Sequence, residues 1–170
     1  DEWGNASSSY RFGSKLKGVS EAARGQVAAL LNASAREIIF TSCATESNNA
    51  ALNAGLRAHP NKRHIITSQV EHSSVLAPCK AWEQQNYRVT YLGVDRDGLL
   101  NLVDLQNALD DDTAIVSLMW ANNETGVLVP VQQIGELCRE RGVLFHCDAV
   151  QAVGKIPIDL AKTPIDYLSL

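Results

Sequence analysis

Apolar residues recur along this chain in two alternating patterns, one at helical spacing and one in short continuous runs. Between residues 14 and 32 the apolar positions follow the period of an amphipathic helix, from Leu16 to Leu31. Short runs such as His64 to Ser68 are typical of buried strands. We therefore expect helices over residues 14–32, 46–58, 74–85, 104–109 and 131–141. We expect strands over residues 37–41, 64–68, 87–92, 114–120, 143–147 and 167–170.

This regular alternation sets the expected fold class. Repeated strand–helix units favour a parallel sheet whose two faces are covered by helices. No internal repeat, low-complexity tract or linker interrupts the chain. We therefore predict a single α/β domain over residues 1–170, a three-layer α/β/α arrangement with a mainly parallel sheet. Because Asp1 is not Met and Leu170 lies inside an apolar run, we expect this domain to be part of a longer protein.

Composition and charge narrow the classes of partner. Fifteen basic against nineteen acidic residues give a formal net charge of −4, which provides no basic footprint for nucleic acid. The sequence shows neither a signal peptide nor an apolar run long enough to span a bilayer, so we expect no membrane partner. Four widely spaced cysteines form no Cys-x-x-Cys pair, so we expect reduced thiols and a cytoplasmic location.

Polar segments follow several predicted strands, and each has two interpretations. Residues 42–47 could present backbone N–H groups and Thr45 Oγ1 to a phosphate, or could simply cap a helix. His72 could stack on a planar ligand or shuttle a proton, or could be a surface or capping residue. Asn122 and Asn123 are typical turn formers, but they are also donors suited to a phenolic oxygen. Taken singly, each segment favours the ordinary structural interpretation.

Asp148 closes the apolar run of residues 143–147, at the carboxyl end of a predicted parallel strand. In open α/β sheets this edge is where ligands bind. A carboxylate in a dry crevice is costly unless it meets a cation or a donor, so Asp148 either caps the next turn or faces a cationic ligand atom. Gln151 would point toward the same ligand if a helical turn follows. His146 alternates onto the same side of the strand, where we expect a packed structural histidine rather than a metal ligand.

Together these strand ends supply what pyridoxal 5'-phosphate (PLP) requires. PLP needs an anion site for its phosphate, a planar partner for its ring and a donor to its ring hydroxyl oxygen. It also needs a carboxylate opposite the pyridine nitrogen, which keeps that nitrogen protonated so that the ring withdraws electrons. The carboxylate in turn gains the cation that its burial demands. Because several polar strand ends converge, we predict PLP as the cofactor.

Four motifs resemble those of the cysteine desulfurases, which are fold-type-I PLP enzymes of the class-V aminotransferase group. They are Ser-Cys-Ala-Thr-Glu-Ser at 42–47, Val-Glu-His at 70–72, Ala-Asn-Asn-Glu-Thr-Gly at 121–126 and His-Cys-Asp-Ala-Val-Gln-Ala-Val-Gly-Lys at 146–155. The likeness covers nearly all of the chain, and the motifs most resemble those of the nitrogen-fixation (NifS) branch. It implies part of the large PLP-binding domain, without its N-terminal start, its cofactor-lysine segment or the C-terminal small domain.

The resemblance implies a role for each matching residue. Ala44 and Thr45 would hold the cofactor phosphate, His72 would stack on the ring and act as the catalytic residue in proton transfer, Asn123 and Gln151 would bind near the ring hydroxyl, and Asp148 would pair with the pyridine nitrogen. Family members convert L-cysteine to L-alanine and pass the sulfur through an enzyme persulfide to a scaffold or acceptor protein for iron–sulfur cluster assembly. They are usually homodimers.

The chain also departs from the family pattern. The lysine that holds PLP covalently lies in a Ser-Gly-His-Lys motif that the family has beyond the position of Leu170, and the nucleophilic cysteine lies further still. Lys155 does not match that lysine, so we expect residues 1–170 alone to be inactive. Ala6 and Tyr10 stand where the family has a proline and a histidine.

Three alternatives accompany this interpretation. One is a non-catalytic scaffold or decoy fragment, which a natural gene ending at Leu170 would support. A related fold-type-I lyase or aminotransferase, such as a selenocysteine lyase, would use the same cofactor. A nucleotide-binding α/β module without PLP would need a Gly-x-Gly-x-x-Gly or Walker loop after its first strand, and residues 42–47 form neither.

Overall fold

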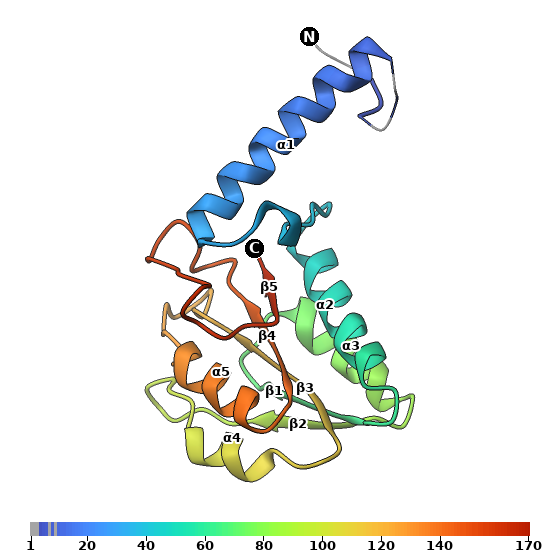
Figure 1. Ribbon diagram of the computed structural model, residues 1–170. Coiled ribbons are helices and arrows are strands. Elements are labelled where there is room, and N and C mark those ends of the chain that lie inside the picture. The colour runs from blue at the N-terminus through green and yellow to red at the C-terminus, as the bar shows by residue number, and fades with distance from the viewer. Residues whose placement is uncertain (1–3, 7, 9) are drawn as a thin grey trace. The chain divides into compact units, whose positions relative to one another are not determined.

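The computed structural model describes residues 4–6, 8 and 10–170, and these divide into two compact units (Figure 1). One unit comprises the described part of Asp1–Phe40 together with Ile158–Lys162. The other comprises Thr41–Pro157 and Thr163–Leu170. All of the predicted site residues belong to this second unit.

In the first unit, α1 (Arg11–Leu31) is the long helix expected from the apolar period. It ends at Asn32, whose φ of 53° is a left-handed conformation that asparagine tolerates better than most residues. A capping box follows, in which Ser34 N donates to Glu37 Oε2 at 2.7 Å and Ser34 Oγ accepts from Arg36 N at 3.4 Å. This box starts the 3-10 helix η1 (Ala35–Glu37).

The predicted strand over residues 37–41 is wrong. Glu37 ends η1, and residues 38–41 form no strand. The Arg24 guanidinium donates to the Ile38 carbonyl and lies 4.8 Å from the centre of the Phe40 ring. Ile39 is 82% exposed. This β-branched and aromatic run is therefore engaged by an arginine of α1 and by no neighbouring strand among the described residues.

In the second unit, five parallel strands form one sheet in the order β2-β1-β3-β4-β5. They are β1 (His64–Ser68), β2 (Arg88–Leu92), β3 (Thr113–Met119), β4 (Leu144–Asp148) and β5 (Tyr167–Ser169). β1 and β3 are buried along their whole length, as continuous apolar runs predict for a parallel sheet covered on both faces. The register aligns Met119, Asp148 and Ser169 across the ends of β3, β4 and β5.

Helices cover both faces of this sheet, which confirms the predicted three-layer α/β/α fold (Figure 1). Helices α2 (Ala44–Ala58) and α3 (Ser73–Glu83) pack on one face, where they bury Leu52 and Val75 completely. Helices α4 (Leu102–Ala108) and α5 (Val131–Glu140) pack on the other face, against a core that includes Phe145. The two apolar layers hold the sheet, and with it the strand ends that carry the polar residues.

The strand order reverses between β1 and β3. The chain passes from β1 outward to β2 and then returns across β1 to β3. Connections on either side of such a point diverge, and the crevice between them, at the carboxyl ends of the strands, is where open α/β sheets bind ligands. The topology therefore points to the ends of β1 and β3.

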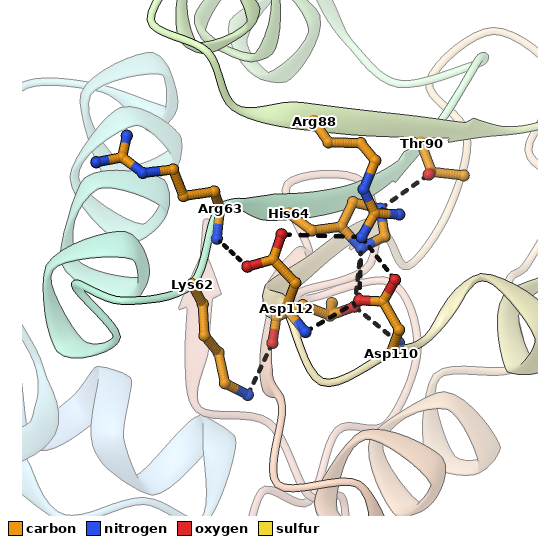
Figure 2. A network of polar contacts seen from close by, with 8 residues as sticks. Lys62, Arg63, His64, Arg88, Thr90, Asp110 and Asp112 are labelled. Carbon is orange, nitrogen blue, oxygen red and sulfur yellow. Dashed lines mark hydrogen bonds and ion pairs between the residues drawn. The ribbon is translucent and has the colours of Figure 1, made fainter.

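The opposite, amino ends of the strands are joined by a polar network (Figure 2). His64 starts β1, is fully buried, and shares hydrogen bonds of 2.8 Å with Thr113 Oγ1 and Thr90 Oγ1. Arg88 donates to Asp110 Oδ2 at 2.6 Å and contacts His64 Nε2 at 3.2 Å. Burial, followed by the charge of Arg88, lowers the pKa of His64. This network ties β1 to β2 and β3 at the far end of the strands from the predicted site.

Within residues 4–6, 8 and 10–170, no helix is both long and apolar enough to cross a bilayer. Over the same residues, His, Cys, Asp and Glu side chains form no group of three or more placed to hold a metal ion.

Candidate functional site

A cavity of about 190 Å³ lies at the carboxyl ends of β1, β3 and β4 and at the start of α2. The six residues singled out in the sequence all line it: Ala44, Thr45, His72, Asn123, Asp148 and Gln151. They come from four separate segments of the chain. The parallel sheet and the helix above it bring these segments to one place.

The start of α2 contributes one wall of the cavity. The N-cap residue is Cys43, which makes no side-chain capping bond, so the expectation that Ser42 or Thr45 is the N-cap is wrong. The segment does start the helix, and Ser42 N and Ser42 Oγ both donate to Glu46 Oε2 at 2.6 Å. Because the first helical bond runs from Ser47 N to the Cys43 carbonyl, the N–H groups of residues 44–46 have no partner within the helix. The N–H of Glu46, followed by the Ser42 hydroxyl, lowers the pKa of the exposed Cys43 thiol. A helix start with this character can hold an anion.

Asp148 is the last residue of β4 and is only 7% exposed. Its Oδ2 accepts from Asn48 Nδ2 at 2.7 Å, and its Oδ1 accepts from Val150 N at 3.1 Å. The turn-capping interpretation therefore holds for one oxygen, while the carboxylate also lines the cavity. In the described part of the chain, no lysine or arginine forms an ion pair with it. A buried carboxylate with only neutral donors fits a cationic ligand atom in the cavity.

The turn after β4 brings Gln151 to the same cavity as Asp148. Ala152 N and Val153 N donate to the Ala149 carbonyl at 2.8 and 3.0 Å, so the chain turns at once after the strand. Gln151 Oε1 accepts a hydrogen bond from Lys155 Nζ. Because this oxygen is engaged, the amide N–H groups are the part of Gln151 that can serve a ligand oxygen.

The two adjacent asparagines after β3 differ in their contacts. Asn122 Oδ1 accepts from Glu124 N at 3.0 Å and from Thr125 N at 2.9 Å, and its Nδ2 donates to the Val70 carbonyl at 3.1 Å. Asn122 is therefore the turn former. Asn123 instead lines the cavity, which is the position required of a donor to a ligand.

His72 is both a capping residue and a cavity residue. As the N-cap of α3, its Nδ1 accepts from Ser74 N at 3.2 Å and lies 2.8 Å from Ser74 Oγ. Asn48 Nδ2 donates to Ser74 Oγ at 2.8 Å and to Asp148 Oδ2 at 2.7 Å. A chain of hydrogen bonds therefore joins His72 to Asp148 through Ser74 and Asn48.

Asn48 and Ser74 carry no strong sequence signal that marks them as site residues. Both are buried, at 0% and 6% exposure, so their partners depend on packing that no local pattern reports. The available signal was weak. Asn48 lies inside α2, and because asparagine is a poor helix former, its presence there indicates a role for its side chain in tertiary contacts.

Glu71 is a second buried carboxyl next to the site. Its Oε1 accepts from Ser68 Oγ at 2.7 Å and from Met119 N at 3.1 Å, whereas its Oε2 meets no donor among the described residues. Burial raises the pKa of Glu71 to about 7, and the nearby Asp148 adds to the rise. Glu71 therefore links the ends of β1 and β3 through one oxygen.

His146 is a packed structural histidine, as expected. Its Nδ1 shares a 2.8 Å hydrogen bond with Ser117 Oγ and its Nε2 a 2.9 Å bond with Ser169 Oγ, so it joins β3, β4 and β5. Both ring nitrogens are thus engaged away from Asp148. Burial lowers the pKa of His146 to about 4.

Comparison with known proteins points to one family. The model of the aminotransferase class-V family matches residues 1–170. Cysteine desulfurase 2 of Trichormus variabilis is 55% identical over 168 residues, and cysteine desulfurase IscS of Neisseria meningitidis is 47% identical over 172 residues. These alignments cover 99% and 100% of this chain but only 42% and 43% of the relatives. The chain therefore spans less than half the length of these curated relatives.

Two solved structures share the architecture. A NifS-like protein superposes with a TM-score of 0.94 at 39% identity, over 99% of this chain and 47% of that chain. The structure of SspA in complex with cysteine also gives a TM-score of 0.94, at 34% identity, over 99% of this chain and 50% of that chain. Both agree with the α/β fold described above.

Proposed function

We propose that this chain, which belongs to the class-V aminotransferase family, is the cofactor-binding part of a PLP-dependent cysteine desulfurase. The observation that carries the proposal is the single cavity lined by all six predicted residues. Its walls offer an anion site, an imidazole ring, amide donors and a buried carboxylate, which are the groups that PLP requires. Residues 1–170 would then form part of the large PLP-binding domain.

Each wall of the cavity has a task in this proposal. The start of α2, at Ala44 and Thr45, would hold the phosphate through backbone N–H groups and a hydroxyl. Asn123 and Gln151 would donate to the ring hydroxyl oxygen. Asp148 would meet the pyridine nitrogen and gain the cationic partner that its burial calls for.

When bound, PLP supplies a ring that withdraws electrons from the bonds of an attached amino acid. His72 would lie against that ring and move protons at Nε2, since its Nδ1 is engaged by Ser74. The structural relative SspA was solved with cysteine, which supports L-cysteine as the substrate class. The whole enzyme would convert L-cysteine to L-alanine and pass on the sulfur through an enzyme persulfide.

The proposal extends to sulfur delivery to a scaffold or acceptor protein for iron–sulfur cluster assembly, and to a homodimer. The likeness to a NifS-like structure supports the nitrogen-fixation branch. Cys43, Cys79, Cys138 and Cys147 are free thiols, which suits the reducing cytoplasm.

The full-length protein provides the test. Loaded with PLP and given L-cysteine and a thiol reductant, it should release alanine and sulfide in equal amounts. The protein stripped of PLP should release neither and should recover when PLP is added. Amino-acid analysis and a sulfide assay measure both products.

Other outcomes identify other functions. Turnover of L-selenocysteine with none of L-cysteine would indicate a selenocysteine lyase, and a keto acid in place of alanine would indicate an aminotransferase. Failure to bind PLP would overturn the proposal altogether.

A further inference from the structure

Asn48 lies at the centre of the hydrogen-bond chain that joins Asp148 to His72. We propose that Asn48 is a positioning residue: it orients the Asp148 carboxylate directly, and it directs the Ser74 hydroxyl proton toward His72 Nδ1. The inference rests on the proposed function for the tasks of Asp148 and His72. The contacts of Asn48 provide the evidence for this positioning role.

The Asn48 amide group is fully buried, so its hydrogen bonds define its orientation. The two N–H groups of Nδ2 serve two acceptors, Asp148 Oδ2 at 2.7 Å and Ser74 Oγ at 2.8 Å. The reversed orientation would bring Oδ1 against the carboxylate, where two acceptors would face each other. In the observed orientation Oδ1 has no donor among the described residues. Because both N–H groups point into the site, the amide oxygen is left without a hydrogen bond, which costs free energy of folding.

The hydrogen bonds that Ser74 makes determine the His72 tautomer. Because Ser74 Oγ accepts from Asn48, its own hydroxyl proton is available for His72 Nδ1, which lies 2.8 Å away. Ser74 N also donates to Nδ1, at 3.2 Å. An Nδ1 that accepts from two donors carries no proton, so the neutral ring has its proton on Nε2.

Asn48 also links two walls of the cavity. Asn48 is one helical turn beyond Ala44, the first residue of α2, and it bonds to Asp148 at the end of β4. The anion site and the carboxylate are therefore held in a fixed relation. An amide donor orients the carboxylate without bringing a cation to it, so Asp148 remains free to pair with a cationic ligand atom.

The first test observes the His72 ring in the full-length, PLP-free protein labelled with ¹⁵N-histidine. The wild type should show an unprotonated Nδ1 and a protonated Nε2, with the signals assigned by their absence in His72→Gln. In Asn48→Ala and Ser74→Ala the backbone N–H of residue 74 still donates to Nδ1, so both variants should keep this tautomer, and the loss of the oriented hydroxyl donor should shift the Nδ1 ¹⁵N signal from its wild-type position. Because no cofactor or substrate is involved, this result stands even if the proposed function fails.

The second test measures PLP affinity by equilibrium dialysis of the full-length protein. Asn48→Ala should weaken binding about tenfold, which corresponds to the loss of one buried hydrogen bond to a charged group. Asn53→Ala is the matched control, because Asn53 lies on the same helix and, among the residues that the structure describes, its Nδ2 donates only to the Asn49 carbonyl, at 2.8 Å. Its affinity should be that of the wild type.

Ser74→Ala keeps the His72 part of the inference testable if Asn48→Ala does not fold, because it removes the link from Asn48 to His72 with a smaller change. A His72 Nδ1 signal that is unchanged from the wild type in both variants would overturn the role of Asn48 in directing the Ser74 hydroxyl toward His72. Wild-type PLP affinity in Asn48→Ala would overturn the role in orienting Asp148. A wild type that binds no PLP would refute the proposed function instead.

Discussion

Replacing Asp148 by asparagine in the full-length enzyme is expected to lower kcat/KM for L-cysteine by a factor on the order of 10² to 10³. Asparagine keeps the shape of the side chain, and its Oδ1 can still accept from Asn48. It removes the charge that would keep the pyridine nitrogen protonated, so the ring would withdraw electrons less strongly. Steady-state alanine formation at saturating PLP measures the loss, because saturation separates slower chemistry from weaker cofactor binding.

Asp166→Asn is the matched control for this substitution. Asp166 is a carboxylate just before β5 whose Oδ2 accepts from Phe145 N at 2.8 Å, and it is not among the residues that line the cavity. This variant removes the same charge and should stay within a few-fold of the wild type. Activity of Asp148→Asn comparable to that of Asp166→Asn would contradict the role assigned to Asp148.

The second large effect is a change in how stability depends on pH when Glu71 is replaced by glutamine. Burial raises the pKa of Glu71 from its ordinary value of 4.5 to about 7 in the folded protein. As pH rises from 4.5 to 7, the unfolded chain therefore loses a proton that the folded protein keeps, and the folded state loses stability. The rise in the pKa of Glu71 corresponds to a loss of at most about 3 kcal/mol in the free energy of unfolding. Between pH 4.5 and 8, Glu71→Gln should gain up to that amount relative to the wild type.

His146 acts in the opposite direction over an overlapping range. Its pKa is lowered from 6.5 to about 4, so the unfolded chain takes up a proton first as pH falls, and stability is lost between pH 6.5 and 4. In the wild type, the stability that Glu71 gains as pH falls offsets the loss from His146. In Glu71→Gln this offset is absent, so the free energy of unfolding should fall more steeply with decreasing pH than in the wild type. Denaturant unfolding of the full-length PLP-free protein measures this, with the exposed Glu140→Gln as control. Parallel pH profiles for wild type and Glu71→Gln would refute the elevated pKa.

The sheet was largely predictable because its strands are continuous apolar runs. The run His64 to Ser68 matches β1 residue for residue, and the other observed strands differ from expectation by at most one residue at either end. The run at residues 37–41 has the same composition but pairs with no strand among the described residues. Local composition favours a strand and cannot report whether a neighbour is present to pair with it.

The cavity residues at strand ends were predictable for a topological reason, since parallel strands bring their carboxyl ends to one edge. The hydrogen-bond chain was not. The bond from Asn48 to Asp148 joins residues 100 positions apart and exists only because α2 packs over the end of β4. Residue type alone could not distinguish Asn122 from Asn123, because the turn decides which of them lines the cavity; only the resemblance to the family singled out Asn123.

In the proposed function, Asp148 meets a protonated pyridine nitrogen in this cavity. The direct measurement is ¹⁵N NMR of the full-length protein loaded with PLP that is labelled at the ring nitrogen. We expect the signal of a protonated nitrogen in the wild type and of an unprotonated nitrogen in Asp148→Asn. An unprotonated nitrogen in the wild type, or the same signal in both proteins, would contradict the claim.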